Sequence, residues 1–263
     1  MHFELIVSGG DTAGFLMHNE RVAIATFRGT RVLGLQDPLA FQASLTPSLH
    51  DIITDAQFLQ APFDEGLVHR GFALAFERMA ADLNERLELH AAAGRSVWFA
   101  GHSLGGALAN LAAARFGPGR FRGLYTYGCP RVGDAAFATL FDSQPYFRVV
   151  HHEDVVPRVP PPFLLGLPPL CYTHAGRLVY IDKDGSVTPD ADPSRVADLM
   201  EGRVDWTALR DGVTDQLRDL AAILAGGLPA RLADVRVPGG AVTDHAPIYY
   251  ASFLKEQLTG RAG

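Results

Sequence analysis

Short apolar runs rich in β-branched residues alternate along the chain with segments in which apolar residues recur every three or four positions. Five of the apolar runs predict buried strands, at residues 22–27, 96–100, 124–127, 146–151 and 177–181. Alternation of such strands with helices is typical of a mostly parallel sheet with helices on both faces. The sequence therefore predicts an α/β fold.

Three segments between these runs have the pattern of helices. Residues 72–89 place apolar side chains at steps of three and four, and Gly94 is expected to end this helix. Residues 105–116 are rich in alanine and stop before a Gly-Pro pair. A third helix is expected over residues 134–141, with Asp134 as its cap.

Two regions depart from this alternation. Residues 31–55 form a long, partly apolar connection. Residues 157–172 contain so many prolines that neither a regular helix nor a central strand is expected there. The apolar side chains of residues 194–224 have helical spacing, and we expect this helix to pack on the main body. We expect one domain over residues 1–263, with an inserted proline-rich and helical region at 157–240.

Composition and charge narrow the possible functions. The net charge is −6 and no run of Lys or Arg is present, which argues against a nucleic-acid interface. No His, Cys or Asp cluster has metal-site spacing along the chain, so neither a metal nor another cofactor is expected. Cys129 and Cys171 are too few for a disulfide framework. One bridge between them is the alternative to two free, mostly buried thiols, which we expect.

The chain shows no segment typical of membrane insertion. No stretch of about 18 apolar residues occurs, so no transmembrane helix is expected. The first ten residues lack the basic start, the long apolar stretch and the cleavage site of a signal peptide. We therefore expect a soluble, cytoplasmic protein. A secreted protein trimmed of its leader would look the same.

Residues 101–105 read Gly-His-Ser-Leu-Gly and lie between a predicted strand and a predicted helix. Such a sharp turn strains the serine backbone and lifts its hydroxyl above the sheet, and the glycines remove side chains that would clash. The helix N-terminus adds N–H groups and partial positive charge, which suits an oxyanion. Ser103 is therefore a candidate nucleophile. The alternative is a serine that only caps the helix, and the adjacent His102 is expected to be structural.

A nucleophilic serine needs a base and an acid, and in doubly wound hydrolases both follow the serine along the chain. Asp154 comes just after the strand at 146–151 and is favoured over Glu153 as the acid. The alternative role of Asp154 is to cap a turn. His245 precedes a final helical segment and is the candidate base. Its rivals are His151, His152 and His174.

Two N–H groups are expected to bind the oxyanion. One belongs to Leu104, the residue after the candidate nucleophile. The other is expected in the loop after the strand at 22–27, where Gly29 permits close approach. There Thr30 offers both its N–H and its hydroxyl.

Six short motifs occur in order along the chain. They are F-R-G-T at 27–30, V-H-R-G-F at 68–72, G-H-S-L-G-G-A-L-A at 101–109, Y-G-C-P-R-V-G-D at 127–134, E-D-V-V-P at 153–157, and an Asp-His pair with a following Tyr at 244, 245 and 249. Together they resemble the class 3 lipases, the fungal-type triacylglycerol lipase family with an α/β-hydrolase fold. The resemblance spans roughly residues 22–256.

Position by position, the resemblance implies the same site. Ser103 would be the nucleophile, Asp154 the acid and His245 the base. Thr30 and Leu104 would be the oxyanion donors. In addition, Arg28 and His69 would support the site structurally.

The resemblance implies a serine carboxylic-ester hydrolase that acts on lipid esters, most simply an acylglycerol lipase at a lipid–water interface. A phospholipase A1, a short-chain esterase or an acyltransferase would share this machinery, and a non-catalytic lipid-binding protein is a further alternative. The family's lid is expected at residues 31–50, although no Trp stands there.

Overall fold

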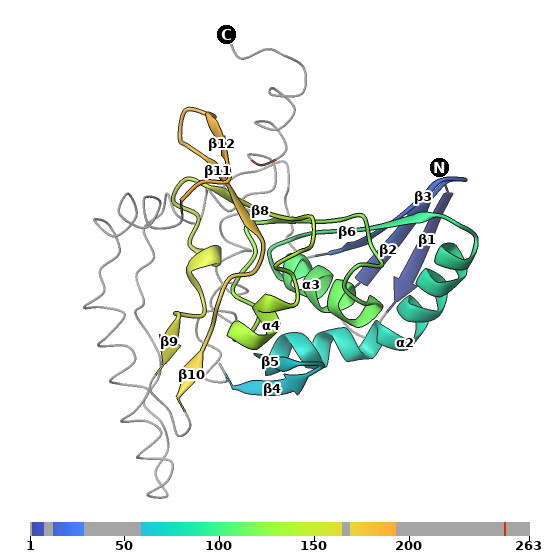
Figure 1. Ribbon diagram of the computed structural model, residues 1–263, viewed down its shortest axis with the longest axis horizontal. Coiled ribbons are helices and arrows are strands. Elements are labelled where there is room, and N and C mark those ends of the chain that lie inside the picture. The colour runs from blue at the N-terminus through green and yellow to red at the C-terminus, as the bar shows by residue number, and fades with distance from the viewer. Residues whose placement is uncertain (1, 8–12, 29–58, 165–168, 193–249, 251–263) are drawn as a thin grey trace, which may run out of the picture.

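An eight-stranded sheet forms the centre of the molecule (Figure 1). The computed structural model describes residues 2–7, 13–28, 59–164, 169–192 and 250. The strands lie in the order β1-β2-β3-β6-β7-β8-β11-β12. Five neighbouring strands are mutually parallel, namely β3 (Val22–Phe27), β6 (Ser96–His102), β7 (Gly123–Tyr127), β8 (Tyr146–His151) and β11 (Arg177–Ile181). The mostly parallel sheet expected from the sequence is confirmed.

Antiparallel strands extend this sheet at both edges. On one side β2 (Ala13–His18) pairs with β3, and β1 (His2–Val7) pairs with β2. On the other side β12 (Val187–Pro189) pairs with β11. Proline lacks an N–H for the sheet ladder, so the edge position of β12 accommodates its proline. These three strands were not predicted from the sequence.

Two long helices cover one face of the sheet (Figure 1). Helix α3 (Leu104–Phe116) lies against β3, β6 and β7, and helix α2 (Arg70–Ala92) packs beside α3. Almost every side chain of α3 is buried, and its alanines allow this close packing. The largest fully buried side chains between these layers are aromatic or long aliphatic, and they include Phe76, Met79, Leu83, Phe99 and Phe116. The helix expected over residues 194–224 lies outside the described residues.

The smaller elements also follow local sequence signals. Hairpin β4 (Gln60–Phe63) and β5 (Gly66–His69), which the sequence analysis missed, precedes α2. Helix α4 (Ala135–Thr139) starts after Asp134, whose carboxylate accepts a hydrogen bond from the Phe137 N–H at 2.9 Å. It ends two residues earlier than expected, and turns follow it. Helix α2 ends just before Gly94, which has a φ of +76°.

The proline-rich stretch forms no regular helix and no central strand in its described part, as expected. It contains the three-residue 3₁₀ turn η1 (Val156–Arg158). The two-residue strands β9 (Phe163–Leu164) and β10 (Leu170–Cys171) pair with each other outside the main sheet. No helix in the described part of the chain combines the length and the apolar character needed to cross a bilayer.

The two cysteines are unpaired. Cys129 is buried, whereas Cys171 is exposed. The expectation of two free thiols is confirmed, but the expectation that both are mostly buried is wrong for Cys171. Cys171 lies in a short hairpin, and no core element among the described residues covers it.

Helix α2 offers a matched test of the core. Leu83 is 2% exposed and Leu89 is 65% exposed on the same helix. We expect Leu83→Ala to lower the free energy of unfolding by about 2–5 kcal/mol, because it leaves a cavity. Leu89→Ala should change it by less than about 0.5 kcal/mol. Urea unfolding followed by circular dichroism measures both, and equal losses would contradict this packing of α2.

The thiols give a second test. Burial raises the pKa of the Cys129 thiol to about 12, so it stays protonated and shielded at neutral pH. We expect Ellman's reagent to titrate one thiol per native chain, that of Cys171, and two thiols in urea. Cys171→Ser should abolish the native reaction. Two reactive thiols in the native protein would show that Cys129 is accessible, and none in urea without reductant would show a disulfide.

Candidate active site

Ser103 occupies a strained turn between β6 and α3. Its φ is +57° and its ψ is −130°, a region that residues with a side chain rarely adopt. Such strain costs about 1–3 kcal/mol and persists only where the surrounding structure enforces it. The Ser103 N–H donates to the Tyr127 carbonyl at 2.9 Å, and the Ser103 carbonyl accepts from the Gly106 N–H at 2.8 Å. These bonds fix the turn to the end of β7 and to the first turn of α3.

Two glycines make this turn sterically possible. A Cβ atom at Gly101 would overlap the backbone of Gly105 in α3. A Cβ atom at Gly105 would overlap the carbonyl of Phe27 at the end of β3. The expectation that these glycines remove clashes with the neighbouring strand and helix is confirmed.

The position of Ser103 argues against the capping alternative. Ser103 stands at the N-cap position of α3, but its side chain makes no capping hydrogen bond within the described structure. Leu104 is the first residue of the helix, and its N–H has no partner inside the helix. This N–H and the helix dipole therefore favour negative charge beside the serine. The second expected oxyanion donor, Thr30, lies outside the described residues.

Asp154 lies three residues beyond the end of β8. It is fully buried, whereas Glu153 is half-buried. One carboxylate oxygen of Asp154 accepts from the Val156 N–H at 2.9 Å, so Asp154 does cap the turn at this position. Because β6 and β8 run parallel, Ser103 and Asp154 both follow the carboxyl ends of their strands, at the same edge of the sheet. Ligand sites in such sheets lie at this edge.

Tyr250 also contacts Asp154, and the sequence analysis did not identify it. The Tyr250 hydroxyl donates to the second carboxylate oxygen of Asp154 at 2.5 Å and accepts from the His151 N–H at 3.1 Å. Its ring packs edge-to-face against His102 and Tyr127, with centroids 5.8 and 6.2 Å apart. Tyr250 therefore links the carboxyl ends of β6, β7 and β8. The only sequence signal was a tyrosine pair after His245, from which the neighbouring Tyr249 was selected.

Two further candidates, His69 and His174, have structural environments. His69 caps α2, because its Nδ1 accepts from the Gly71 and Phe72 N–H groups at 3.1 and 3.4 Å. Burial lowers the pKa of His69 to about 4, so it is neutral at physiological pH. The His174 Nε2–H donates to the Pro157 carbonyl at 2.7 Å. The candidate base His245 lies outside the described residues.

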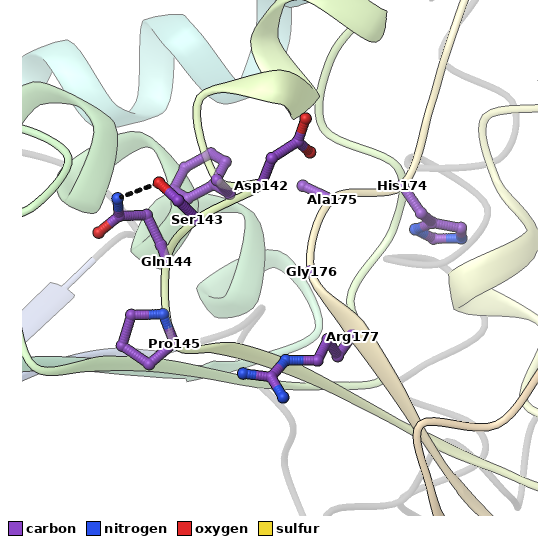
Figure 2. A pocket seen from close by; sticks show the side chains of 9 residues that line it. Asp142, Ser143, Gln144, Pro145, His174, Ala175, Gly176 and Arg177 are labelled. Carbon is purple, nitrogen blue, oxygen red and sulfur yellow. Dashed lines mark hydrogen bonds between the residues drawn. The ribbon is translucent and has the colours of Figure 1, made fainter.

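A surface pocket of about 500 Å³ lies at the amino ends of β8 and β11, away from Ser103 (Figure 2). Its walls are the segment before β8 and the segment before β11, and they include Asp142, Gln144, His174 and Arg177. Since Ser103 follows the carboxyl end of β6, this pocket at the amino ends of β8 and β11 does not belong to the serine site. Among the described residues, one group of potential metal ligands lies close together, and it too is at the amino edge of the parallel strands.

Comparison with known proteins agrees with this arrangement. The model of the family "Lipase (class 3)" matches residues 25–164, more than half of the chain. "Secreted mono- and diacylglycerol lipase 1" of Fusarium solani is 43% identical over 99 residues, which is 36% of this chain and 30% of that protein. "Lipase" of Rhizopus oryzae is 32% identical over 166 residues, 57% of this chain and 38% of that protein. This chain therefore matches only about a third of the length of these two relatives.

Solved structures show the same fold. A lipase from Rhizopus microsporus var. chinensis has a TM-score of 0.51 and 31% identity, and the match covers 68% of this chain and 61% of that one. The native propeptide complex of Rhizomucor miehei lipase has a TM-score of 0.57 and 25% identity, over 75% and 66% of the two chains. A strained serine between a strand and a helix, with glycines on both sides, is typical of this fold, the α/β-hydrolase fold. This chain belongs to the class 3 lipase family.

Proposed function

We propose that this protein is a serine hydrolase of lipid carboxylic esters, with Ser103 as nucleophile, His245 as base and Asp154 as acid. The observation that carries the proposal is the strained conformation of Ser103 at a helix N-terminus, at the same sheet edge as the buried Asp154. Ser103 is strained, and its side chain makes no capping hydrogen bond among the described residues. It therefore has no structural advantage over Gly, which would adopt the same φ without strain. The conformation is explained if the hydroxyl must reach a substrate.

The reaction follows from these roles. His245 takes the Ser103 proton while the Oγ atom attacks the ester carbonyl carbon, and the carbonyl oxygen becomes an oxyanion. The N–H groups of Leu104 and Thr30 stabilise that charge. His245 then gives the proton to the leaving alcohol, and the acyl-serine forms. His245 then takes a proton from water, which attacks the acyl-serine carbonyl carbon. His245 gives this proton back to Ser103 Oγ as the carboxylic acid leaves, which restores the free serine.

Asp154 holds the imidazole in the tautomer that this reaction requires and stabilises the imidazolium. Its two oxygens accept hydrogen bonds from the Val156 N–H and the Tyr250 hydroxyl. These bonds offset the removal of the carboxylate from water and fix its orientation. We therefore assign Tyr250 as a positioning residue, which acts on the reaction through Asp154.

For the substrate we propose acylglycerols. Two relatives are named mono- and diacylglycerol lipases, those of Fusarium solani and Penicillium cyclopium. A relative from Oryza sativa named "Phospholipase A1-II 4", 29% identical over 197 residues, makes phospholipid the second candidate. The candidate lid at 31–50 lies outside the described residues. Within the described part, Phe163 of β9 is 55% exposed and offers apolar surface for lipid.

The names of the relatives also bear on the compartment. The same two acylglycerol lipases are called secreted. We infer from them that secretion is favoured over the cytoplasmic location expected from the sequence.

The nucleophile is tested by hydrolysis of p-nitrophenyl esters from C2 to C16 and of mono-, di- and triacylglycerol emulsions. We expect Ser103→Ala to lower kcat by roughly 10⁵–10⁶-fold, since the acyl-enzyme cannot form. Ser143→Ala, which removes an exposed hydroxyl from the pocket of Figure 2, is the matched control and should leave kcat unchanged.

Preference for long acyl chains and emulsions supports a lipase, and preference for short soluble esters indicates an esterase. If the wild type is inert on every ester and no fluorophosphonate labels it, the protein is non-catalytic. Equal activity of wild type and Ser103→Ala would mean that Ser103 is not the nucleophile.

The positioning role of Tyr250 predicts a second kinetic effect. Tyr250→Phe keeps the ring packing but removes the hydrogen bond to Asp154. We expect kcat to fall about tenfold at unchanged KM, because a hydrogen bond to a charged group contributes about 1.5–3 kcal/mol. Without this donor, Asp154 attracts the imidazolium more strongly, so the acid limb of the kcat/KM profile should move to higher pH.

Tyr125→Phe, which removes a hydroxyl from the ring stacked between Trp98 and Phe147, is the control. Its kinetics and pH profile should match the wild type. A loss of thermal stability in Tyr250→Phe with no kinetic change would show that the Tyr250 hydroxyl has only a structural role.

A further inference from the structure

Three potential metal ligands meet where the β1–β2 hairpin packs on the end of α2. Glu4 lies on β1, His18 ends β2 and His90 lies in the last turn of α2. One carboxylate oxygen of Glu4 is 3.0 Å from His18 Nε2 and 3.3 Å from His90 Nε2. The three ligand atoms all lie within 4.8 Å of one another. Figure 1 shows the C-terminal end of α2 beside β1.

The spacing of these atoms fits a small transition metal. Zinc binds imidazole nitrogen and carboxylate oxygen at about 2.0–2.2 Å in a tetrahedron, so its ligand atoms lie about 3.3 Å apart. The two distances from Glu4 already have this length, and the third side of the triangle needs to shorten by no more than about 1.5 Å. We propose that Glu4, His18 and His90 bind a divalent transition-metal ion of the zinc class.

The surroundings orient Glu4 toward the two imidazoles. Arg86 donates to the other carboxylate oxygen of Glu4 at 2.9 Å, and this bond aims the first oxygen at the two imidazoles. Asp82 pairs with Arg86 at 2.8 Å and offsets its charge.

An open cavity of about 470 Å³ reaches His18, one of the three proposed ligands. It is lined by His2, His18, Asn19, Glu20, Arg21 and Arg95. His2 is the cross-strand partner of His18, and their rings stack with centroids 5.2 Å apart. His2 or a water molecule can therefore supply the fourth ligand. His18 Nδ1 has no hydrogen-bond partner within the described structure, so no second bond holds His18 in its present tautomer.

Arg95 competes with the metal. Its guanidinium lies 3.1 Å from His90 Nδ1 and acts as the donor, because arginine has no acceptor. His90 then carries its proton on Nε2, the atom that must bind the metal. Zinc binding at Nε2 requires this proton to move to Nδ1, so the Arg95 side chain has to turn away from Nδ1 into the cavity that it lines. Removing Arg95 should therefore strengthen metal binding.

The bound ion would act on the structure rather than on the reaction. His18 pairs with Ala23 near the start of β3, at the amino edge of the parallel strands, whereas Ser103 follows their carboxyl edge. The metal would cross-link the β1–β2 hairpin to α2 in the same way as a structural zinc site. The three ligands are far apart in sequence, which is why the sequence predicted no metal site.

Zinc titration of the full chain, prepared without a polyhistidine tag and stripped with EDTA, tests the proposal. Isothermal titration calorimetry should show one zinc ion per chain with higher affinity than any other. The melting temperature should rise by about 5 °C at a hundredfold excess of zinc over Kd. Cobalt(II) should give the intense visible bands of a tetrahedral site.

Matched variants assign the site, because the chain has ten histidines that can bind zinc weakly. Glu4→Gln and His90→Gln should raise the Kd about tenfold or more, whereas Glu20→Gln, in the same cavity, should not. Arg95→Met should lower the Kd, and Arg21→Met, which removes a charge from the same cavity without contacting His90, should not. Each melting temperature is compared with and without zinc, so a destabilised variant still reports its zinc response.

Two outcomes would overturn the proposal. The first is no zinc-dependent rise in melting temperature in the wild type. This result would mean that hydrogen bonds alone hold the cluster together and that it does not bind zinc. The second is an equal Kd in wild type, Glu4→Gln and His90→Gln, which would place the zinc elsewhere. Neither outcome bears on the ester hydrolase, because the zinc assays do not use its activity.

Discussion

The close approach of the α3 N-terminus to the carboxyl ends of β3 and β6 is the constraint on which the site depends. It requires that no side chain stand at Gly101 or Gly105, since a Cβ at either position would overlap neighbouring backbone. The same approach forces Ser103 to a positive φ and brings helix N–H groups to its side. The close approach of α3 to the strand ends therefore causes both the strain at Ser103 and the site for negative charge beside it.

Tyr250 extends this constraint across the sheet. Its hydroxyl binds the buried Asp154 and its ring packs on side chains at the ends of β6 and β7. A buried carboxylate is stable only where hydrogen bonds replace its lost water, and Tyr250 provides one of them from nearly 100 residues away. Tyr250, a residue distant in sequence, is therefore coupled to Asp154 without being a reactive group itself.

The two ends of the parallel strands carry different groups of polar side chains. The serine and the buried acid follow the carboxyl ends of the parallel strands, where side chains from separate loops converge. The cluster of Glu4, His18 and His90 lies at the amino edge, between a hairpin and the end of a helix. The proposed metal cross-link at the amino ends of the strands would stabilise the β1–β2 hairpin without changing the geometry around Ser103.

The sequence by itself determined the features that depend on neighbouring residues. Three central strands have the predicted ends, at 22–27, 146–151 and 177–181, because their mostly apolar runs are bounded by polar or turn residues. The serine turn was equally predictable, because a local glycine pattern sets it. Only the tertiary structure decided the role of Tyr250, the exposure of Cys171 and the meeting of Glu4, His18 and His90. Each of these depends on which distant elements pack together. The hydrophobic periodicity of the sequence predicts the elements themselves but not their packing partners.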